Sequence, residues 1–185
     1  MNIWDSYSSA EMQTSNAYTS ASVPYLSLSN SNLSISITKK IRAPLPFVFD
    51  WCTDFREDDS QLVGSTSKKT ILEKTSEKVV YVTEMTNQGR TLKTNSVVTL
   101  TPPDKWHLDA VGDDKDYTGN YQLFAEDNDT RLEMSFDYSF KTEPVPTTEQ
   151  KTAGSSSFWD KIIVALERDY EKSYKIHSDW TIPNY

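Results

Sequence analysis

The side chains that most often carry catalysis are sparse in this chain. There are two histidines, His107 and His177, and a single cysteine, Cys52. Strand alternation sets His107 opposite its neighbours Trp106 and Leu108, on the expected outer face, and His177 follows the last predicted helix. One cysteine and two well-separated histidines do not supply the ligands of a zinc site. We therefore predict no metal site and no catalytic residue.

Motifs for nucleotide binding and hydrolysis are also missing. The sequence contains neither GxGxxG nor GxxxxGK[ST], and it contains no GxSxG. Acidic pairs such as Asp58-Asp59 and Asp113-Asp114 lie in polar segments. Nothing in the pattern indicates burial that would raise a carboxyl pKa, so these pairs are typical of solvated loops. No cofactor is predicted.

Aromatic residues with a few polar neighbours are the features that could form a binding site. Ligand pockets are mostly apolar, with a few polar groups that orient the ligand. Glu84 shares a face with Val80 and Val82, so it is a candidate inward carboxylate, and a buried carboxylate is costly unless it is paired. The hydroxyls of Tyr121 and Tyr138 would also need partners if buried. The predicted ligand-binding residues are Trp51, Phe55, Glu84, Trp106, Leu108, Tyr121, Met134, Phe136, Tyr138, Ile162, Ile163 and Leu166.

The elements that position these residues begin after residue 32. Residues 1–32 are rich in Ser, Asn, Thr and Ala and show no sustained period. This composition predicts a disordered or loosely attached tail, although its aromatic residues could cap a pocket or contact a partner. Residues 33–38 alternate between apolar and polar, as in a half-buried strand. Two prolines then end this strand, and residues 47–55 have the spacing of a short amphipathic helix.

Strand patterns follow one another from residue 68 to residue 140. They are separated by turn signals such as Asn87-Gln88-Gly89 and Asp127-Asn128-Asp129. The last strand is the clearest, because Leu132 to Phe140 alternates apolar and polar side chains without interruption. Consecutive strands with short turns predict an antiparallel meander whose apolar face must be covered.

The longest helical pattern runs from Phe158 to about Ile176, and Ser155 to Ser157 offers its N-cap. Its broad apolar stripe must pack on another element for the helix to be stable. Residues 177–185 are predicted to be an irregular tail. The order of elements predicts an α+β domain over residues 33–176 with a helix-grip fold. In this fold, a curved antiparallel sheet of about six to seven strands wraps around a long C-terminal helix.

Several local patterns accompany this order of elements. Ile41-Arg42-Ala43-Pro44 is followed at once by Phe47 to Trp51, and Pro102 to Trp106 precedes a strand. Gly119 to Leu123 then leads to Asp129 to Leu132. Together they resemble the SRPBCC superfamily, which includes START domains, birch-pollen-allergen-like proteins and polyketide cyclases/dehydrases. The resemblance covers about residues 33–176. It implies a cavity for a lipid, isoprenoid, polyketide or similar ligand and carries over no catalytic residue.

Charge and composition exclude several other classes of protein. The formal net charge is −8, which argues against a nucleic-acid binder and against docking on anionic lipid. No stretch approaches the roughly 18 apolar residues of a membrane span, and no signal peptide is visible. These absences predict a cytoplasmic location, and the single cysteine is compatible with a reducing compartment.

Three functions remain open. The leading hypothesis is binding or transport of a hydrophobic small molecule between sheet and helix. The second is a cyclase/dehydrase-type enzyme in which Tyr121, Tyr138 and Glu84 exchange protons inside the same cavity, which requires these three side chains to converge. The third is a protein-interaction module with a solid core. The sequence does not predict an oligomeric state.

Overall fold

The computed structural model describes residues 31–87 and 89–178. The described elements are β1 (Ser31–Ile41), α1 (Leu45–Thr53), α2 (Asp59–Leu62), β2 (Lys68–Lys74), β3 (Lys78–Asn87), β4 (Arg90–Thr101), β5 (Lys105–Gly112), β6 (Lys115–Glu126), β7 (Asp129–Phe140) and α3 (Thr148–Ser178). They confirm the predicted α+β class. The sequence predicts tails over residues 1–32 and 177–185. Residues 31 and 32 belong to β1 and residues 177 and 178 to α3, whereas residues 1–30 and 179–185 lie outside the described residues.

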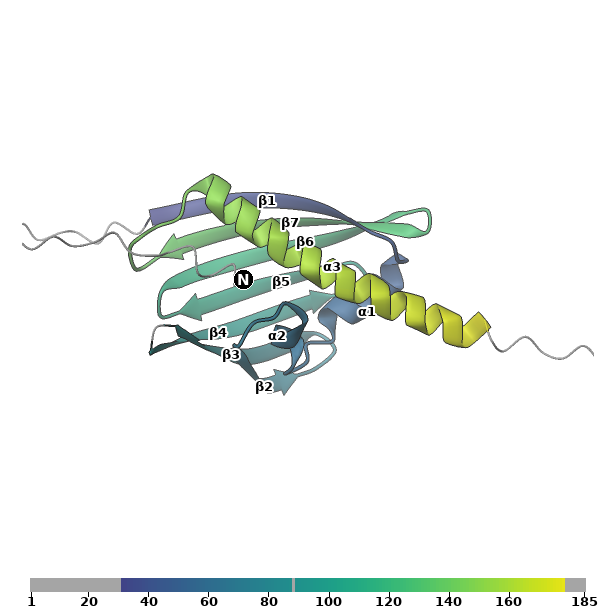
Figure 1. The fold of residues 1–185 in the computed structure, drawn as a ribbon, viewed down its shortest axis with the longest axis horizontal. Helices are drawn as coiled ribbons and strands as arrows, with labels where there is room; N and C mark the ends of the chain where they lie inside the picture. Colours follow the sequence, from purple (N-terminus) through teal and green to yellow (C-terminus); the bar gives the residue numbers. More distant parts are fainter. Residues whose placement is uncertain (1–30, 88, 179–185) are drawn as a thin grey trace, which may run out of the picture.

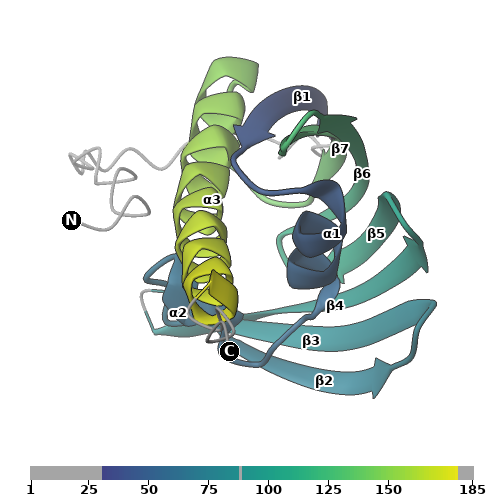
Figure 2. The ribbon, with the colours of Figure 1, turned by 90° about the vertical axis from the view of Figure 1, so that its right-hand side faces the viewer.

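The seven strands form one antiparallel sheet in the order β1-β7-β6-β5-β4-β3-β2. Strands β2 to β7 form a meander, and β1 adds to the end of the sheet by pairing with β7. As a result β1 and β2, which are neighbours in sequence, form opposite edges, and α1 and α2 lie in the connection between them. Helix α3 runs diagonally across one face (Figure 1), and the sheet curves toward it with α1 at one end (Figure 2). The helix-grip prediction is confirmed.

The strand register aligns apolar residues in rows across the concave face. Tyr121 is opposite Trp106 on one side and Met134 on the other, and Met134 is opposite Ile37. Each of these four residues is buried. Because side chains alternate along every strand, the neighbouring rows of polar residues face outward. The alternation predicted for the last strand is confirmed, since Leu132, Met134, Phe136 and Tyr138 are all buried.

Helix α3 begins at Thr148, ten residues before the predicted start at Phe158. The amide of Gln150 donates to the hydroxyl of Thr147 at 3.2 Å, and the amide of Thr147 donates to the Gln150 side chain at 2.9 Å. This reciprocal pair is a capping box, which satisfies donors at the helix start. Gly154 and the three serines after it are weak helix formers, but the cap before them and tertiary packing outweigh that preference.

Polar contacts attach α3 to β1 and to α1. Lys39 of β1 donates to Ser156 at 2.7 Å and to Asp160 at 2.5 Å. The guanidinium and the backbone amide of Arg42 both donate to the Glu167 carboxylate, which holds the pKa of Glu167 below its usual value. From α1, the indole of Trp51 donates to Asp169 at 3.3 Å. These contacts fix one side of the helix to the sheet edge.

Across residues 31–87 and 89–178, no helix combines the length and the apolar character needed to cross a lipid bilayer.

Candidate functional site

A small cavity lies between the sheet, α1 and α3. Its volume is about 90 Å³, and its lining is almost entirely apolar and aromatic. The side chains come from α1 and the segment after it, from strands β3 to β6, and from α3. They are Cys52, Phe55, Tyr81, Val98, Trp106, Leu108, Tyr121 and Trp159.

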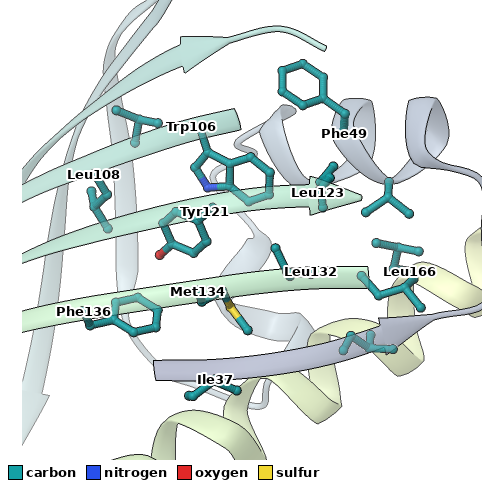
Figure 3. Packing of buried hydrophobic residues seen from close by; sticks show 14 of the residues in the cluster. Ile37, Phe49, Trp106, Leu108, Tyr121, Leu123, Leu132, Met134, Phe136 and Leu166 are labelled. Atoms are coloured by element: carbon teal, nitrogen blue, oxygen red, sulfur yellow. The ribbon is translucent and has the colours of Figure 1, made fainter. Parts of the chain in front are cut away.

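Packed rings form the walls of this cavity. Trp106 stacks on Tyr121 with ring centroids 4.8 Å apart, and Phe49 of α1 meets the edge of Trp106 at 6.2 Å. Figure 3 shows Trp106 and Tyr121 side by side on neighbouring strands, with Phe49 beyond them. Trp159 of α3 packs against Tyr121, with ring centroids 5.8 Å apart. Such pairs contribute about 0.5–1.5 kcal/mol each beyond their area burial, so they define the shape of the space they surround.

Four inward tyrosines bring hydroxyls to this concave face. They are Tyr81 on β3, Tyr117 and Tyr121 on β6, and Tyr138 on β7. Apart from electrostatic contacts of Tyr81 with Ser96 and of Tyr138 with Ser155, these hydroxyls have no partner among residues 31–87 and 89–178. Neither contact has hydrogen-bond geometry, and the buried Ser96 hydroxyl itself stays without a hydrogen bond in that part of the chain. Ser96 Oγ is the one fully buried side-chain polar atom without a hydrogen bond among the described residues, so the tyrosine hydroxyls are not fully buried and can donate to a polar atom from outside the chain.

Burial also determines the protonation state of these phenols. Desolvation raises the pKa of Tyr81 and Tyr117, and it raises the pKa of Tyr121 most strongly. It raises the pKa of Tyr138 to about 12. The shifts of Tyr117 and Tyr121 are increased by the neighbouring tyrosines, since one charged phenolate disfavours the next. All four therefore stay protonated at neutral pH and are hydrogen-bond donors.

A glycine in β6 makes room for this aromatic cluster. Gly119 lies opposite Leu108 on β5 and Phe136 on β7. A Cβ atom at position 119 would lie 3.1 Å from the rings of both Phe136 and Tyr121. The absence of a side chain thus allows Tyr121 and Phe136 to meet edge to face, with centroids 5.5 Å apart.

Cys52 is half-buried on the wall of the cavity, and desolvation raises the pKa of its thiol to about 12. Only the thiolate reacts with alkylating agents. We therefore expect iodoacetamide at pH 8 to label native Cys52 about a thousandfold more slowly than the same residue in urea-unfolded protein. Mass spectrometry of timed samples measures both rates. Rates within tenfold of one another would contradict the desolvation of this thiol.

Glu84 does not point inward as predicted. Val79 and Tyr81 of β3 face the core, so Glu84 lies on the outer face with Val80 and Val82. There its carboxylate pairs with Lys93 on β4 at 2.6 Å, and its side chain is 37% exposed. The Lys93 ammonium holds the pKa of Glu84 below its usual value. The predicted inward placement is wrong, and no carboxylate of residues 31–87 or 89–178 lines the cavity.

The other predicted residues divide into three groups. Phe55, Trp106, Leu108 and Tyr121 line the cavity. Met134, Phe136, Tyr138, Ile163 and Leu166 are buried around it, and Ile162 is half-buried on α3. Trp51 lies at the α1–α3 contact, with the Arg56 guanidinium 5.2 Å from its ring. The ligand-binding role of these residues stays a prediction.

Sequence reasoning missed four residues of the lining, namely Cys52, Tyr81, Val98 and Trp159. Trp159 belongs to the predicted apolar stripe of the last helix, so that stripe was the available signal. Cys52 follows Trp51 directly in the short helix. Tyr81 and Val98 lie in runs of consecutive apolar residues, where alternation does not distinguish the two faces of a sheet.

A second hollow, with a volume of about 470 Å³, lies on the outer face of the sheet over β1 and β4 to β7. Its lining combines exposed polar side chains, among which His107 lies on the outer face as predicted, with Ile37, Trp106, Tyr121 and Met134. The His107 ring contacts Asn120 at 2.7 Å through Nδ1 and Asp109 at 3.2 Å through Nε2. The hollow is larger than the inner cavity, but exposed polar side chains cannot exclude water from an apolar ligand. We therefore regard the inner cavity as the candidate site.

No group of His, Cys, Asp or Glu suited to a metal ion occurs in the described part of the chain.

Comparison with known proteins identifies relatives by structure alone. No protein-family model and no curated protein matches the sequence. The structure of the Zhui aromatase/cyclase from Streptomyces sp. R1128 superimposes with a TM-score of 0.60 at 16% identity, over 77% of this chain and 95% of that one.

Two further solved structures superimpose almost as well. Ara h 8.0201 gives a TM-score of 0.59 at 14% identity, over 74% of this chain and 98% of that one. A START superfamily protein from Mycobacterium smegmatis gives a TM-score of 0.55 at 19% identity, over 75% of this chain and 97% of that one. Sequence identities this low reveal shared architecture and not shared chemistry. The chain therefore has the START-like, helix-grip fold that these three structures share.

Proposed function

We propose that this protein binds an apolar small molecule bearing polar substituents, in the space between the concave face of the sheet and α3. The observation that carries the proposal is an almost entirely apolar and aromatic cavity, beside which four inward tyrosines, two of them buried and two half-buried, bring phenol donors. A mostly apolar lining with a few convergent donors is typical of small-molecule sites. A lipid, isoprenoid or polyketide would fit this chemistry, and the cytoplasm is the proposed location.

The size of the cavity sets a condition on binding. A volume of about 90 Å³ holds about three water molecules, whereas sites for drug-sized ligands measure about 300–1,000 Å³. The main chain of α3 lies close to β1, α1 and α2, while side chains alone span the distance to the middle of the sheet. Binding a larger ligand therefore requires rings such as Trp159 to rotate, or α3 to move outward about its attachment to β1.

The geometry favours binding over the enzyme with a tyrosine–carboxylate proton relay. That hypothesis needs Glu84 near Tyr121 and Tyr138, but Glu84 lies on the opposite face of the sheet. The cyclase/dehydrase alternative is left with tyrosines as its proton donors. The comparison with an aromatase/cyclase supports it only at the level of fold.

The test uses N-phenyl-1-naphthylamine, an uncharged apolar dye whose fluorescence rises on leaving water. We expect micromolar binding to the wild-type protein and a loss of about tenfold or more in Val98→Phe. Val98 is buried and lines the cavity, so a phenyl ring at this position occupies the space that the dye needs. Fluorescence titration measures the two dissociation constants.

The matched control is Val97→Phe. Val97 is the next residue on the same strand, but it lies on the outer face and is 38% exposed. Its substitution is expected to leave dye binding unchanged. Failure of the wild-type protein to bind the dye, or equal losses in both variants, would favour the protein-interaction module with a solid core.

A further inference from the structure

A lysine at the start of α3 lies against the same aromatic cluster. The Nζ atom of Lys151 is 4.2 Å from the centroid of the Tyr138 ring. Tyr138 in turn stacks between Phe136 and Phe140, with centroids 6.1 and 5.9 Å away. Lys151 is half-buried, so its ammonium is partly removed from water beside rings and not beside a carboxylate.

The charge of Lys151 is not balanced by a direct partner. In the described part of the chain, its ammonium forms neither an ion pair nor a hydrogen bond. The charges that act on it are those of Lys115 and Asp114, which already pair with one another at 2.6 Å. These three side chains therefore carry one net positive charge, in a protein whose formal net charge is −8.

The pKa of Lys151 agrees with this geometry. Desolvation, followed by repulsion from Lys115, lowers the pKa of the Lys151 ammonium to about 8 against the weaker opposing effect of Asp114. At pH 7 the group is still mostly protonated. A partly desolvated cation without a partner is costly, and an anion placed beside it would reduce that cost.

The position of Lys151 also relates it to the cavity. Lys151, Ser155 and Trp159 are spaced four residues apart and therefore lie on one face of α3. Ser155 lies near the Tyr138 hydroxyl, and Trp159 lines the cavity. At a rise of 1.5 Å per residue, Lys151 is about 12 Å from Trp159 along the helix axis. Lys151 contacts the ring of Tyr138, and Trp159 contacts the ring of Tyr121, so inward tyrosines lie beside both ends of this face.

We propose that Lys151 anchors the acidic head of the ligand, so that the protein selects apolar molecules with a single anionic group at one end. The apolar body would extend about 12 Å from Lys151 over Tyr138 toward Trp159 and the cavity. This inference rests on the proposed function, because it assigns the ligand class for that site.

The test compares two dyes that differ by one charge. The dye 8-anilinonaphthalene-1-sulfonate has the ring system of N-phenyl-1-naphthylamine plus a sulfonate. We expect Lys151→Met to weaken binding of the sulfonate dye by about tenfold or more and to change binding of the uncharged dye by less than about twofold. Lys151→Arg, which keeps the charge, should stay within about threefold of wild type for both dyes. The control is Lys172→Met, at an exposed position of α3, which should change neither dissociation constant.

A pH titration provides a second measurement, which does not depend on the folding of Lys151→Met. Between pH 7 and 10, wild-type affinity for the sulfonate dye should fall as pH rises above about 8, because the neutral amine no longer attracts the anion. In Lys151→Arg this fall should be absent, since a guanidinium stays charged. Equal losses for both dyes in Lys151→Met, or the same pH profile in Lys151→Arg, would overturn the anchoring role. If neither dye binds the wild-type protein, the proposed function itself fails.

Discussion

Leu166→Ala is expected to lower the free energy of unfolding by about 2–5 kcal/mol. Leu166 is fully buried on α3. Figure 3 shows it beside Leu132, where the helix meets the sheet. Truncation removes apolar burial and leaves a void that rigid strands cannot fill. Since packing is what keeps α3 on the sheet, the same change should also weaken dye binding.

Urea unfolding followed by tryptophan fluorescence measures this loss. The control is Val164→Ala, on the same helix at a side chain that is 68% exposed. It should alter the free energy of unfolding by less than about 0.5 kcal/mol. A similar small effect in Leu166→Ala would mean that α3 contributes little to stability, which would contradict the packing described above.

The second large effect is expected for Gly119→Val, with a loss of about 1–3 kcal/mol in the free energy of unfolding. Strand propensity alone predicts the opposite sign, because valine favours strands and glycine does not. Here the new side chain would clash with the rings of Phe136 and Tyr121, each 3.1 Å from the added Cβ. Overpacking should therefore outweigh propensity and also displace the ring of Tyr121, which lines the cavity.

Thr118→Val is the matched control, because residue 118 is adjacent on β6 and faces outward. It pairs with Asp109 and Asp137 in the outer row, and valine there should be neutral or slightly stabilising. Near-ultraviolet circular dichroism reports the displaced rings, and urea unfolding reports stability. Equal stability of Gly119→Val and the wild-type protein would show that the aromatic cluster can move aside at no cost.

The meander could be predicted because its strands alternate cleanly. Leu132 to Phe140 has one apolar and one polar face, so alternation alone gave both the strand and its orientation. The apolar stripe of α3 likewise indicated a covering helix. Only its first ten residues were missed, because Gly154 and its serine neighbours obscure the start that Thr147 and Gln150 define.

Glu84 illustrates where alternation fails. Residues 79–82 are all apolar, so either face of β3 could be the inner one by composition. Pairing with β4 decides the choice, since Tyr81 lies opposite the buried Ser96 and Val79 opposite the buried Val98. Register of this kind depends on contacts between strands and is not contained in the pattern of one strand.

The volume of the cavity could not be predicted for a different reason. The same aromatic residues can fill a core or surround a space, and their number and type do not distinguish the two cases. What distinguishes them here is the close arrangement of rings that Gly119 allows and the entry of Trp159 from α3. Both depend on the tertiary arrangement of elements distant in sequence.

The pairing of β1 with the last strand of the sheet has a consequence for the synthesis of the protein. The partner of β1 is β7, and Ile41 pairs with Thr130, about 90 residues later. At elongation rates of about 5–20 residues per second, roughly 5–20 seconds pass on the ribosome before this partner has been made. During that time Ile35, Ile37 and Ile41 have no strand to pair with, so the apolar side chains of the first strand stay unpaired the longest.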